Sequence, residues 1–340
     1  MKLGMQIAAG AAAALTVAVA GVVLGTTERP PMEGIQRGYR GVAMEQVYNP
    51  RFLAEAREEN KVPLSLGRLP DGGAKAGAVY KNVKVLGGES VGNFTRLMAS
   101  MTNWVSPTQG CAYCHDVNNM ASDNLYTKVV SRRMIQMVQH INADWKTHVA
   151  ETGVTCYTCH RGQPVPANIW YHNPGPVQAG GFAQSPAGKN HPTAVANSSS
   201  LPFDPFTPFL EQDNNIRIVS QTALPGTDRS SIKQTDWTYS LMMHFSQGLG
   251  VQCTYCHNSR SWTDWDQSTP ARVTAWYGIR MVRDVNNNYL NPLQTVLPAV
   301  RLGPEGDSPK VNCATCHNGV YKPLFGVSMA KDFPELQTVP

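Results

Sequence analysis

Charge is scarce in this chain and is nowhere concentrated. Asp, Glu, Lys and Arg make up only 16% of the 340 residues, the formal net charge is +5, and no run of basic residues occurs. A nucleic-acid-binding protein needs a basic patch or stripe that meets the phosphate backbone. The sequence therefore gives no support to a nucleic-acid partner.

Cysteine is missing from the first 110 residues, which excludes a lipid-anchored cysteine at the mature N-terminus. Instead, Lys2 precedes an apolar run over residues 7–24, which is just long enough to cross a bilayer as a helix. Ala18-Val19-Ala20 offers an alternative interpretation as a signal-peptide cleavage site. We predict an uncleaved membrane anchor over residues 1–27, with its N-terminus in the cytoplasm and the remainder of the chain exported.

No cysteine lies outside a C-x-x-C-H unit, and the chain has four such units. Two thiols at this spacing add across the vinyl groups of one porphyrin, and the adjacent histidine ligates its iron. Disulfides would suit an exported protein and zinc would suit paired C-x-x-C units, but both leave the histidines unexplained. The sequence thus predicts four covalently bound c-type haems, whose propionates would offset the positive net charge. The units are Cys111, Cys114 and His115; Cys156, Cys159 and His160; Cys253, Cys256 and His257; and Cys313, Cys316 and His317.

A helical pattern precedes each unit, and much of the remaining chain shows little regular pattern. Helices are predicted over residues 94–104, 125–149, 237–248 and 272–290, with a shorter one near 51–59. The predicted fold class is mainly α with much irregular structure: a multihaem cytochrome c of two dihaem halves behind an N-terminal transmembrane helix. The predicted divisions are the anchor at 1–27, an irregular segment at 28–92, the first dihaem segment at 93–163, a Pro/Gly-rich connector at 164–236, the second dihaem segment at 237–320 and a tail at 321–340.

The two halves repeat each other in sequence. Residues 137–142 align with residues 281–286, and an aromatic residue follows each stretch, Trp145 in the first half and Tyr289 in the second. We therefore expect a pseudo-twofold relation between the halves. The haems should form much of each core, because the segments between the units are too short to bury much surface alone.

Each iron has a sixth position, where methionine gives a higher reduction potential than a second histidine. The helix ahead of each of the first three units offers two methionines: Met98 and Met101, Met134 and Met137, and Met242 and Met243. In the fourth unit Gly278 aligns with Met134, so its ligand is either Met281 or a residue from elsewhere, with His148 the best remaining candidate. Counting histidines alone leaves a bis-His set open, although His172 and His191 lie in the connector and are expected to face solvent.

At these residues the chain resembles the tetrahaem cytochrome c subunit of purple-bacterial photosynthetic reaction centres, over nearly all of its length after the anchor. Residues 155–162, 241–245 and 275–284 carry the resemblance. It implies three Met/His haems and one His/His haem. The sixth ligands it implies are Met98, Met134 and Met242 for the first three haems and His148 for the fourth. The side chains it excludes as ligands are Met101, Met137, Met243, Met281, His140 and His244.

The resemblance also implies a role and a location. Such a subunit sits on the periplasmic face of the inner photosynthetic membrane, associates with the reaction-centre core subunits and re-reduces the photo-oxidised bacteriochlorophyll special pair. Its donor is a soluble c-type cytochrome or a high-potential iron–sulfur protein that docks near the first haem, and its third haem lies nearest the special pair. Arg272 matches a family arginine close to the third haem, where it would hold a propionate or raise the potential; a solvated residue at a helix start is the alternative. Many members carry a lipidated N-terminal cysteine, and this chain departs from that pattern.

A membrane-anchored multihaem quinol dehydrogenase is the alternative from another class, because it also combines one N-terminal helix with four such units. Those chains are typically much shorter and favour bis-His ligation, so the methionines at matched spacing and the long connector argue against that interpretation. The sequence offers no recognisable nucleophile–base pair, and six-coordinate irons leave no open position for a substrate. We therefore predict an electron carrier and not an enzyme.

Overall fold

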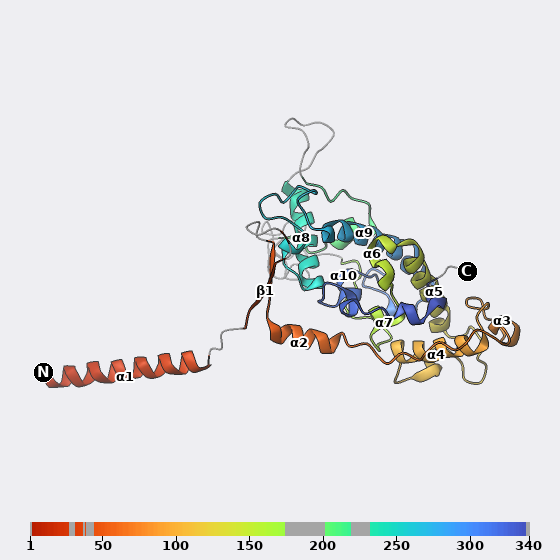
Figure 1. The fold of residues 1–340 in the computed structure, drawn as a ribbon, viewed down its shortest axis with the longest axis horizontal. Helices are drawn as coiled ribbons and strands as arrows, with labels where there is room; N and C mark the ends of the chain where they lie inside the picture. Colours follow the sequence, from red (N-terminus) through yellow and green to blue (C-terminus); the bar gives the residue numbers. More distant parts are fainter. Residues whose placement is uncertain are drawn as a thin grey trace, which may run out of the picture.

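The computed structural model describes residues 2–26, 31–36, 38, 44–173, 201–218 and 232–337. Helices and single helical turns dominate this part of the chain, and its strands form one short hairpin (Figure 1). The fold is thus mainly α, as predicted. The α-helices are α1 (Lys2–Thr26), α2 (Pro50–Glu59), α3 (Ala76–Val79), α4 (Val91–Val105), α5 (Tyr126–Asp144), α6 (Lys146–Val149), α7 (Cys156–His160), α8 (Ile232–Leu249), α9 (Pro270–Val285) and α10 (Cys313–His317).

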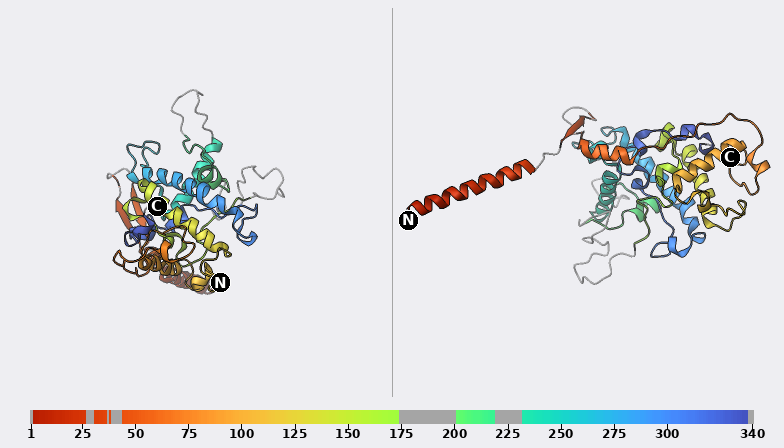
Figure 2. Two further views of the ribbon diagram at one scale, coloured as in Figure 1. Left: turned by 90° about the vertical axis from the view of Figure 1, so that its right-hand side faces the viewer. Right: turned by 90° about the horizontal axis from the view of Figure 1, so that it is seen from below.

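Helix α1 projects away from the rest of the protein and is exposed along its length (Figure 2). By length and composition its segment Gln6–Thr26 is able to cross a membrane. The polar group of Thr16 is satisfied inside the helix, because its hydroxyl donates to the carbonyl of Ala12 at 2.9 Å. The helix agrees with the predicted anchor; that it stays uncleaved remains a prediction.

A hairpin follows the anchor in a region for which the sequence predicts irregular structure. Strands β1 (Glu33–Gln36) and β2 (Glu45–Tyr48) pair antiparallel, with Glu33 opposite Tyr48. Each strand has only four residues, too few for an alternating pattern to be recognised. The hairpin matters because β2 packs against the short 3₁₀ turn η5 (Cys253–Tyr255), which opens the third C-x-x-C-H unit.

The helices ahead of the units form where the periodicity predicts them, with two differences. The pattern over residues 125–149 divides into α5 and α6, because the backbone leaves helical geometry at Trp145. The pattern over residues 272–290 ends as an α-helix at Val285 and continues as a π turn, η6 (Asn286–Leu290). π turns within helices frequently occur at functional sites. Asn286 is fully buried at this one.

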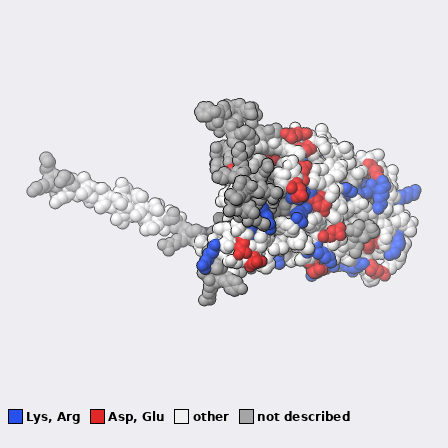
Figure 3. All heavy atoms as spheres, turned by 90° about the horizontal axis from the view of Figure 1, so that it is seen from above, with Lys and Arg blue, Asp and Glu red and all other residues white. Residues whose placement is uncertain are grey.

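The C-terminal segment, predicted as a tail over residues 321–340, contributes side chains to the core. Phe333 and Leu336 are fully buried, and the ring of Phe333 packs edge-on against Trp104 of α4 with centroids 4.7 Å apart. Between them Glu335 forms an ion pair of 2.6 Å with Arg96, and both side chains are almost fully buried. On the face shown in Figure 3, acidic and basic side chains are interspersed over the body of the protein.

Candidate haem-binding site

The four C-x-x-C-H units adopt two local folds, which alternate along the chain. The first and third units begin with 3₁₀ turns, η1 (Gly110–Tyr113) and η5. The second and fourth units are complete short helices, α7 and α10. The units therefore repeat as pairs, in agreement with the sequence repeat.

The first and third units share a matching hydrogen bond. Thr127, at the start of α5, donates its hydroxyl to the carbonyl of Tyr113 inside the first unit at 2.5 Å. Thr269, just before α9, donates in the same way to Tyr255 inside the third unit, also at 2.5 Å. In both places the helix that follows the unit holds the backbone between its two cysteines.

The second and fourth units are each fixed by a capping box, in which two side chains satisfy each other's free backbone N–H groups at a helix start. Thr155 and Thr158 form the box of α7, and Asn312 and Thr315 form that of α10. Each of these helices ends in a left-handed residue directly after its histidine, Arg161 or Asn318, which stops the helix there. The two short helices thus hold their cysteines and histidine in the same arrangement.

All four histidines of the units are oriented in one way. In each, ring atom Nδ1 lies at hydrogen-bond distance from a nearby backbone carbonyl, where it donates as N–H. This fixes the tautomer and leaves Nε2 with its lone pair, which is how histidine ligands of metals are commonly held. The contacts are His115 to Met120 at 3.1 Å, His160 to Gln163 at 2.9 Å, His257 to Trp262 at 3.0 Å and His317 to Val320 at 3.0 Å.

Burial favours the uncharged form of the histidines in the second, third and fourth units. It lowers the pKa of His160 and His257, and burial together with the nearby His148 lowers the pKa of His317 to about 4. A metal ligand must be a neutral imidazole, so the environment favours the ligating form at neutral pH. Burial also raises the pKa of the thiols, to about 11 for Cys114 and Cys256 and to about 12 for Cys156 and Cys313.

The second and fourth units lie against each other. Helices α7 and α10 are in contact, and Cys159 and Cys316 are joined as a disulfide with their Cα atoms 4.5 Å apart. A thioether to haem uses the same sulfur atoms, so one sulfur cannot take part in both bonds. The predicted thioethers at these two cysteines therefore stay predictions, and the contact itself identifies the second and fourth units as neighbours.

His148 faces the histidine of the fourth unit. The ring centroids of His148 and His317 are 6.2 Å apart, and two imidazoles bound to one iron at about 2 Å each would have nearly this separation. His148 Nδ1 lies 2.9 Å from the carbonyl of Thr274, which leaves its Nε2 free in the same way as in the four units. The residues present fit a bis-His haem at the fourth unit.

Gly278 makes room for His148. A Cβ atom at position 278 would lie only 2.6 Å from Cε1 of His148 and 2.9 Å from its Nδ1, well inside van der Waals contact. The repeat therefore places the imidazole ring of His148 against the position that aligns with Met134. This gives a physical reason for the glycine, which the alignment alone did not supply.

The predicted methionine ligands lie on the expected helices. Met98 is on α4, Met134 on α5 and Met242 on α8, and all three side chains are half-buried. Their neighbours Met101 and Met137 pack against the same apolar cluster as Met98 and Met134, and Met281 is buried in it. The three assignments stay predictions.

Arg272 occupies the first turn of α9 and is half-buried. Its guanidinium donates to the carbonyl of Asp264 and the hydroxyl of Ser268, both at 2.8 Å, and lies 4.0 Å above the ring of Trp265. Its pKa is lowered, mainly by burial. Arg272 therefore holds the loop after the third unit in place; its effect on a haem stays a prediction.

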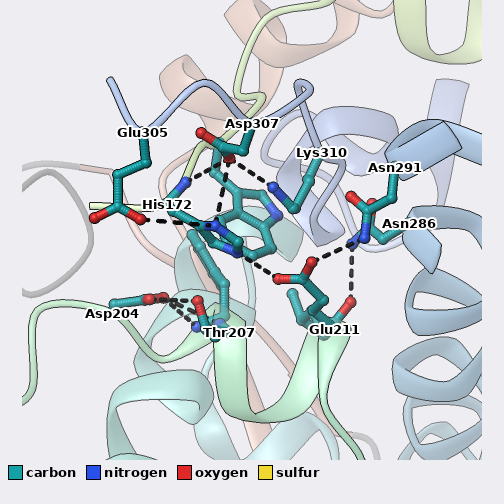
Figure 4. A network of polar contacts seen from close by, with 12 residues as sticks. His172, Asp204, Thr207, Glu211, Asn286, Asn291, Glu305, Asp307 and Lys310 are labelled. Carbon is teal, nitrogen blue, oxygen red and sulfur yellow. Dashed lines mark hydrogen bonds and ion pairs between the residues drawn. The ribbon is translucent and has the colours of Figure 1, made fainter. Parts of the chain in front are cut away.

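His172 corrects one expectation. The sequence places it in the connector and predicts a solvent-facing side chain, but only 30% of that side chain is exposed and its Nε2 lies 2.6 Å from Glu211. Figure 4 shows the polar network around it, in which Lys310 and the backbone of His172 both donate to Asp307. A charged network is hard to foresee, because its members come from segments far apart in the sequence. His191 lies outside the described residues.

His244, two residues after Met242, is 5% exposed, and burial lowers its pKa to about 4. Its ring packs edge-on against Phe206 at 4.6 Å, and its Nε2 has no hydrogen-bond partner among the described residues. It lines a cavity of about 570 Å³ that also borders Ala314 of the fourth unit. It is a neutral, packed histidine in this structure.

Two asparagines hold the backbone just before the second and fourth units, a role that sequence reasoning missed. Asn142 exchanges hydrogen bonds with the backbone of Val154, two residues before Cys156. Asn286 does the same with Val311, two residues before Cys313. The only available signal was that both asparagines close the aligned stretches.

Covalent attachment motifs with uniformly oriented histidines define a c-type cytochrome. Among the described residues no group of three or more His, Cys, Asp and Glu side chains is placed to hold a metal ion. The chain belongs to the family described as the photosynthetic reaction centre cytochrome C subunit, whose sequence model matches residues 28–337.

Individual relatives agree with this assignment. The chain is 52% identical over 328 residues to the photosynthetic reaction center cytochrome c subunit of Rubrivivax gelatinosus, covering 96% of this chain and 89% of the relative. It is 54% identical over 320 residues to the subunit of the same name from Thermochromatium tepidum, covering 94% and 79%. It is 43% identical over 284 residues to that of Roseobacter denitrificans, covering 79% and 76%.

Proposed function

We propose that the protein carries four covalently bound c-type haems and re-reduces the photo-oxidised bacteriochlorophyll special pair of a photosynthetic reaction centre. The role as electron donor within the reaction centre follows from membership of the family. The number of haems, their ligands and the soluble donor, a c-type cytochrome or a high-potential iron–sulfur protein, belong to the proposal. When bound, the haems supply reversible one-electron chemistry.

The chain's own residues attach, orient and tune each haem. The cysteines of each unit would form the thioethers, and the histidine of each unit would be one axial ligand. The proposed second axial ligands are Met98, Met134 and Met242 for the first three haems and His148 for the fourth. Methionine favours a higher reduction potential than histidine. The fourth haem, with His148 as its proposed second ligand, should therefore have a lower potential than it would have with a methionine there.

The observation that carries the proposal is the common orientation of the four unit histidines. Each Nδ1 is occupied by a backbone carbonyl within five residues in sequence, so each Nε2 stays available. Disulfide formation requires no such arrangement. A haem iron does, because it binds neutral imidazole through one nitrogen while the other is held by the protein.

The position of the hairpin supports a direction for electron transfer. Gln46 in β2 is fully buried, donates to Thr254 of the third unit at 2.9 Å and accepts from the backbone of Gln252 at 3.0 Å. The anchor helix thus leads directly into a hairpin held at the third unit, whereas α4, ahead of the first unit, lies toward the opposite end of the body (Figure 1). The proposal accordingly has the third haem nearest the membrane on its periplasmic side, and the soluble donor at the first.

A pseudo-twofold arrangement of two dihaem halves is also part of the proposal. The alternating local folds of the units, the matched threonines Thr127 and Thr269 and the matched asparagines Asn142 and Asn286 support it. The division of the chain at residues 93–163 and 237–320 remains an interpretation of that repeat.

Flash spectroscopy on membranes that contain the native complex tests the proposal. After a single actinic flash, the haem α-band should show oxidation at the same rate as the special pair is re-reduced. Haems that stay reduced through the flash would contradict it. If quinol then reduced the haems directly, the protein would be a multihaem quinol dehydrogenase, a function that no comparison favours.

A further inference from the structure

His140 sits between two carboxylates that come from different halves of the protein. Its Nδ1 lies 2.6 Å from Asp144 in its own helix α5, and its Nε2 lies 2.6 Å from Asp284 in α9. The side chains of His140 and Asp284 are only 23% and 20% exposed, whereas Asp144 is 59% exposed. The contact that joins the two halves is therefore the more protected one.

Both ring nitrogens of His140 thus face carboxylate oxygens. A carboxylate without a proton only accepts, so each contact is a hydrogen bond when the ring nitrogen in it carries a proton. The other side chains that face this pair are Tyr289, whose ring stacks on His140 at 5.3 Å, and Arg133, which lies 4.7 Å above Tyr289. Burial acts to raise the pKa of Asp284, but hydrogen bonds from His140, Asn288 and Trp145 outweigh it and keep that pKa below its usual range.

The contact joins positions that correspond in the repeat. In the alignment of residues 137–142 with 281–286, His140 stands opposite Asp284, and Trp145 corresponds to Tyr289. Two symmetry-related contacts flank the pair: His140 stacks on Tyr289, and Trp145 donates to Asp284 at 2.7 Å. Contacts of this kind, in which i meets j and j meets i, are those of a twofold interface. His140 and Asp284 therefore lie where the pseudo-axis would pass.

We propose that His140, held between the two carboxylates, is a positioning residue that fixes α5 relative to α9 and thereby sets the spacing of the second and fourth haems. Helix α5 carries Met134 and leads into α6 with His148, while α9 carries the glycine against which His148 packs. A change in how the two helices meet would displace both sixth ligands together. The inference rests on the proposed function for the identity of these ligands.

The decisive experiment compares redox titrations of the native complex and of His140→Phe. The phenyl ring keeps the stacking on Tyr289 but removes both hydrogen bonds. In H140F the equilibrium constant for sharing an electron between the second and fourth haems should change by up to tenfold, which is about 59 mV.

Two further variants separate positioning from mere stability. Asp284→Asn keeps the shape but removes the carboxylate that Nε2 of His140 contacts, so it should move the potentials of the same two haems as H140F does, whereas His140→Lys, which keeps a donor for Asp284, should leave them closer to those of the unmodified protein. A double-mutant cycle on thermal unfolding should show strong coupling between positions 140 and 284 and weaker coupling between 140 and 144. If H140F fails to fold, the potentials of the second and fourth haems in D284N decide the matter.

The outcomes are distinguishable from a failure of the proposed function. An unmodified protein without covalent haem, or without methionine ligation in its near-infrared spectrum, would refute the proposed function. Normal haem content and ligation, together with potentials in H140F and D284N identical to those of the unmodified protein, would refute the role of His140 alone.

Discussion

Helices α5 and α9 are built on one plan but serve the sixth coordination position differently. Both begin next to a threonine that holds the preceding unit, and both end near an asparagine that holds the next one. They differ where α5 has Met134 and α9 has Gly278, with the ring of His148 against that glycine. With the proposed ligands, the comparison teaches that a repeat can keep its scaffold and replace a methionine ligand by a histidine from another helix, beside a glycine that makes room for it.

The largest effect is expected from filling that space with Gly278→Ala. The new Cβ would lie 2.6 Å from Cε1 of His148, so the ring must leave its present position relative to His317. We expect the low-spin bis-His signal of the fourth haem to be lost in electron paramagnetic resonance, with a shift in its potential on the order of a tenth of a volt or more. Gly88→Ala, where a Cβ meets nothing within 4 Å, is the matched control. An unchanged spectrum in G278A would remove His148 from the proposed ligand set.

The segments that lead into the second and fourth units also differ. Three residues before its first cysteine the second unit has Gly153, with φ +60°, whereas the fourth has Lys310, which is 1% exposed and donates to Asp307 at 2.6 Å. Removing one member of a buried pair leaves the other charge uncompensated, which costs about 3–5 kcal/mol. Lys310→Met should therefore lower the free energy of unfolding by roughly that amount, as measured by chemical denaturation.

The pH dependence of that loss follows from Asp307. Burial acts to raise its pKa, but hydrogen bonds from Lys310 and from the backbone of His172 outweigh it and keep the pKa below its usual range. A carboxyl whose pKa is lowered on folding contributes stability above its unfolded pKa and loses it as the pH falls through its folded pKa. The difference between the unmodified protein and K310M should thus be full at neutral pH and shrink below about pH 4. A pH-independent difference would show that the loss does not come from the ionised carboxylate of Asp307.

Asn142 and Asn286 test a feature that the two halves share. Asn142 makes hydrogen bonds of 2.7–2.9 Å to Val154 and Leu336, and Asn286 makes bonds of 2.9–3.0 Å to Val311 and Leu210. Replacing either by alanine leaves buried backbone groups without partners, which costs about 2–4 kcal/mol in total. We expect N142A and N286A to destabilise the protein equally in thermal unfolding. A much smaller effect at one position would break the equivalence of the halves.

The sequence predicts those features that depend on local pattern. Residue spacing predicts the C-x-x-C-H units, the helices ahead of them and the repeat around residues 140 and 284. The hairpin of β1 and β2, the burial of Phe333 and Leu336 and the environment of His172 are not, because each depends on contacts between distant segments. His148 illustrates the boundary: the alignment identifies a gap at Gly278, but only the packed structure shows that the imidazole occupies the space beside it.

The smallest expected effect concerns the capping boxes of α7 and α10. Thr158 and Thr315 each accept a hydrogen bond of 3.0 Å from the backbone N–H three residues earlier. Valine has the same shape without the hydroxyl, so Thr158→Val and Thr315→Val should each lower the free energy of unfolding by about 1 kcal/mol. Thr315 also donates to the carbonyl of Asn168 at 3.0 Å, and the loss at that position should be the larger of the two. If thermal unfolding of the two variants showed the opposite order, the additional contact with Asn168 would not be a source of stability, and the two boxes would differ for a reason outside the helices themselves.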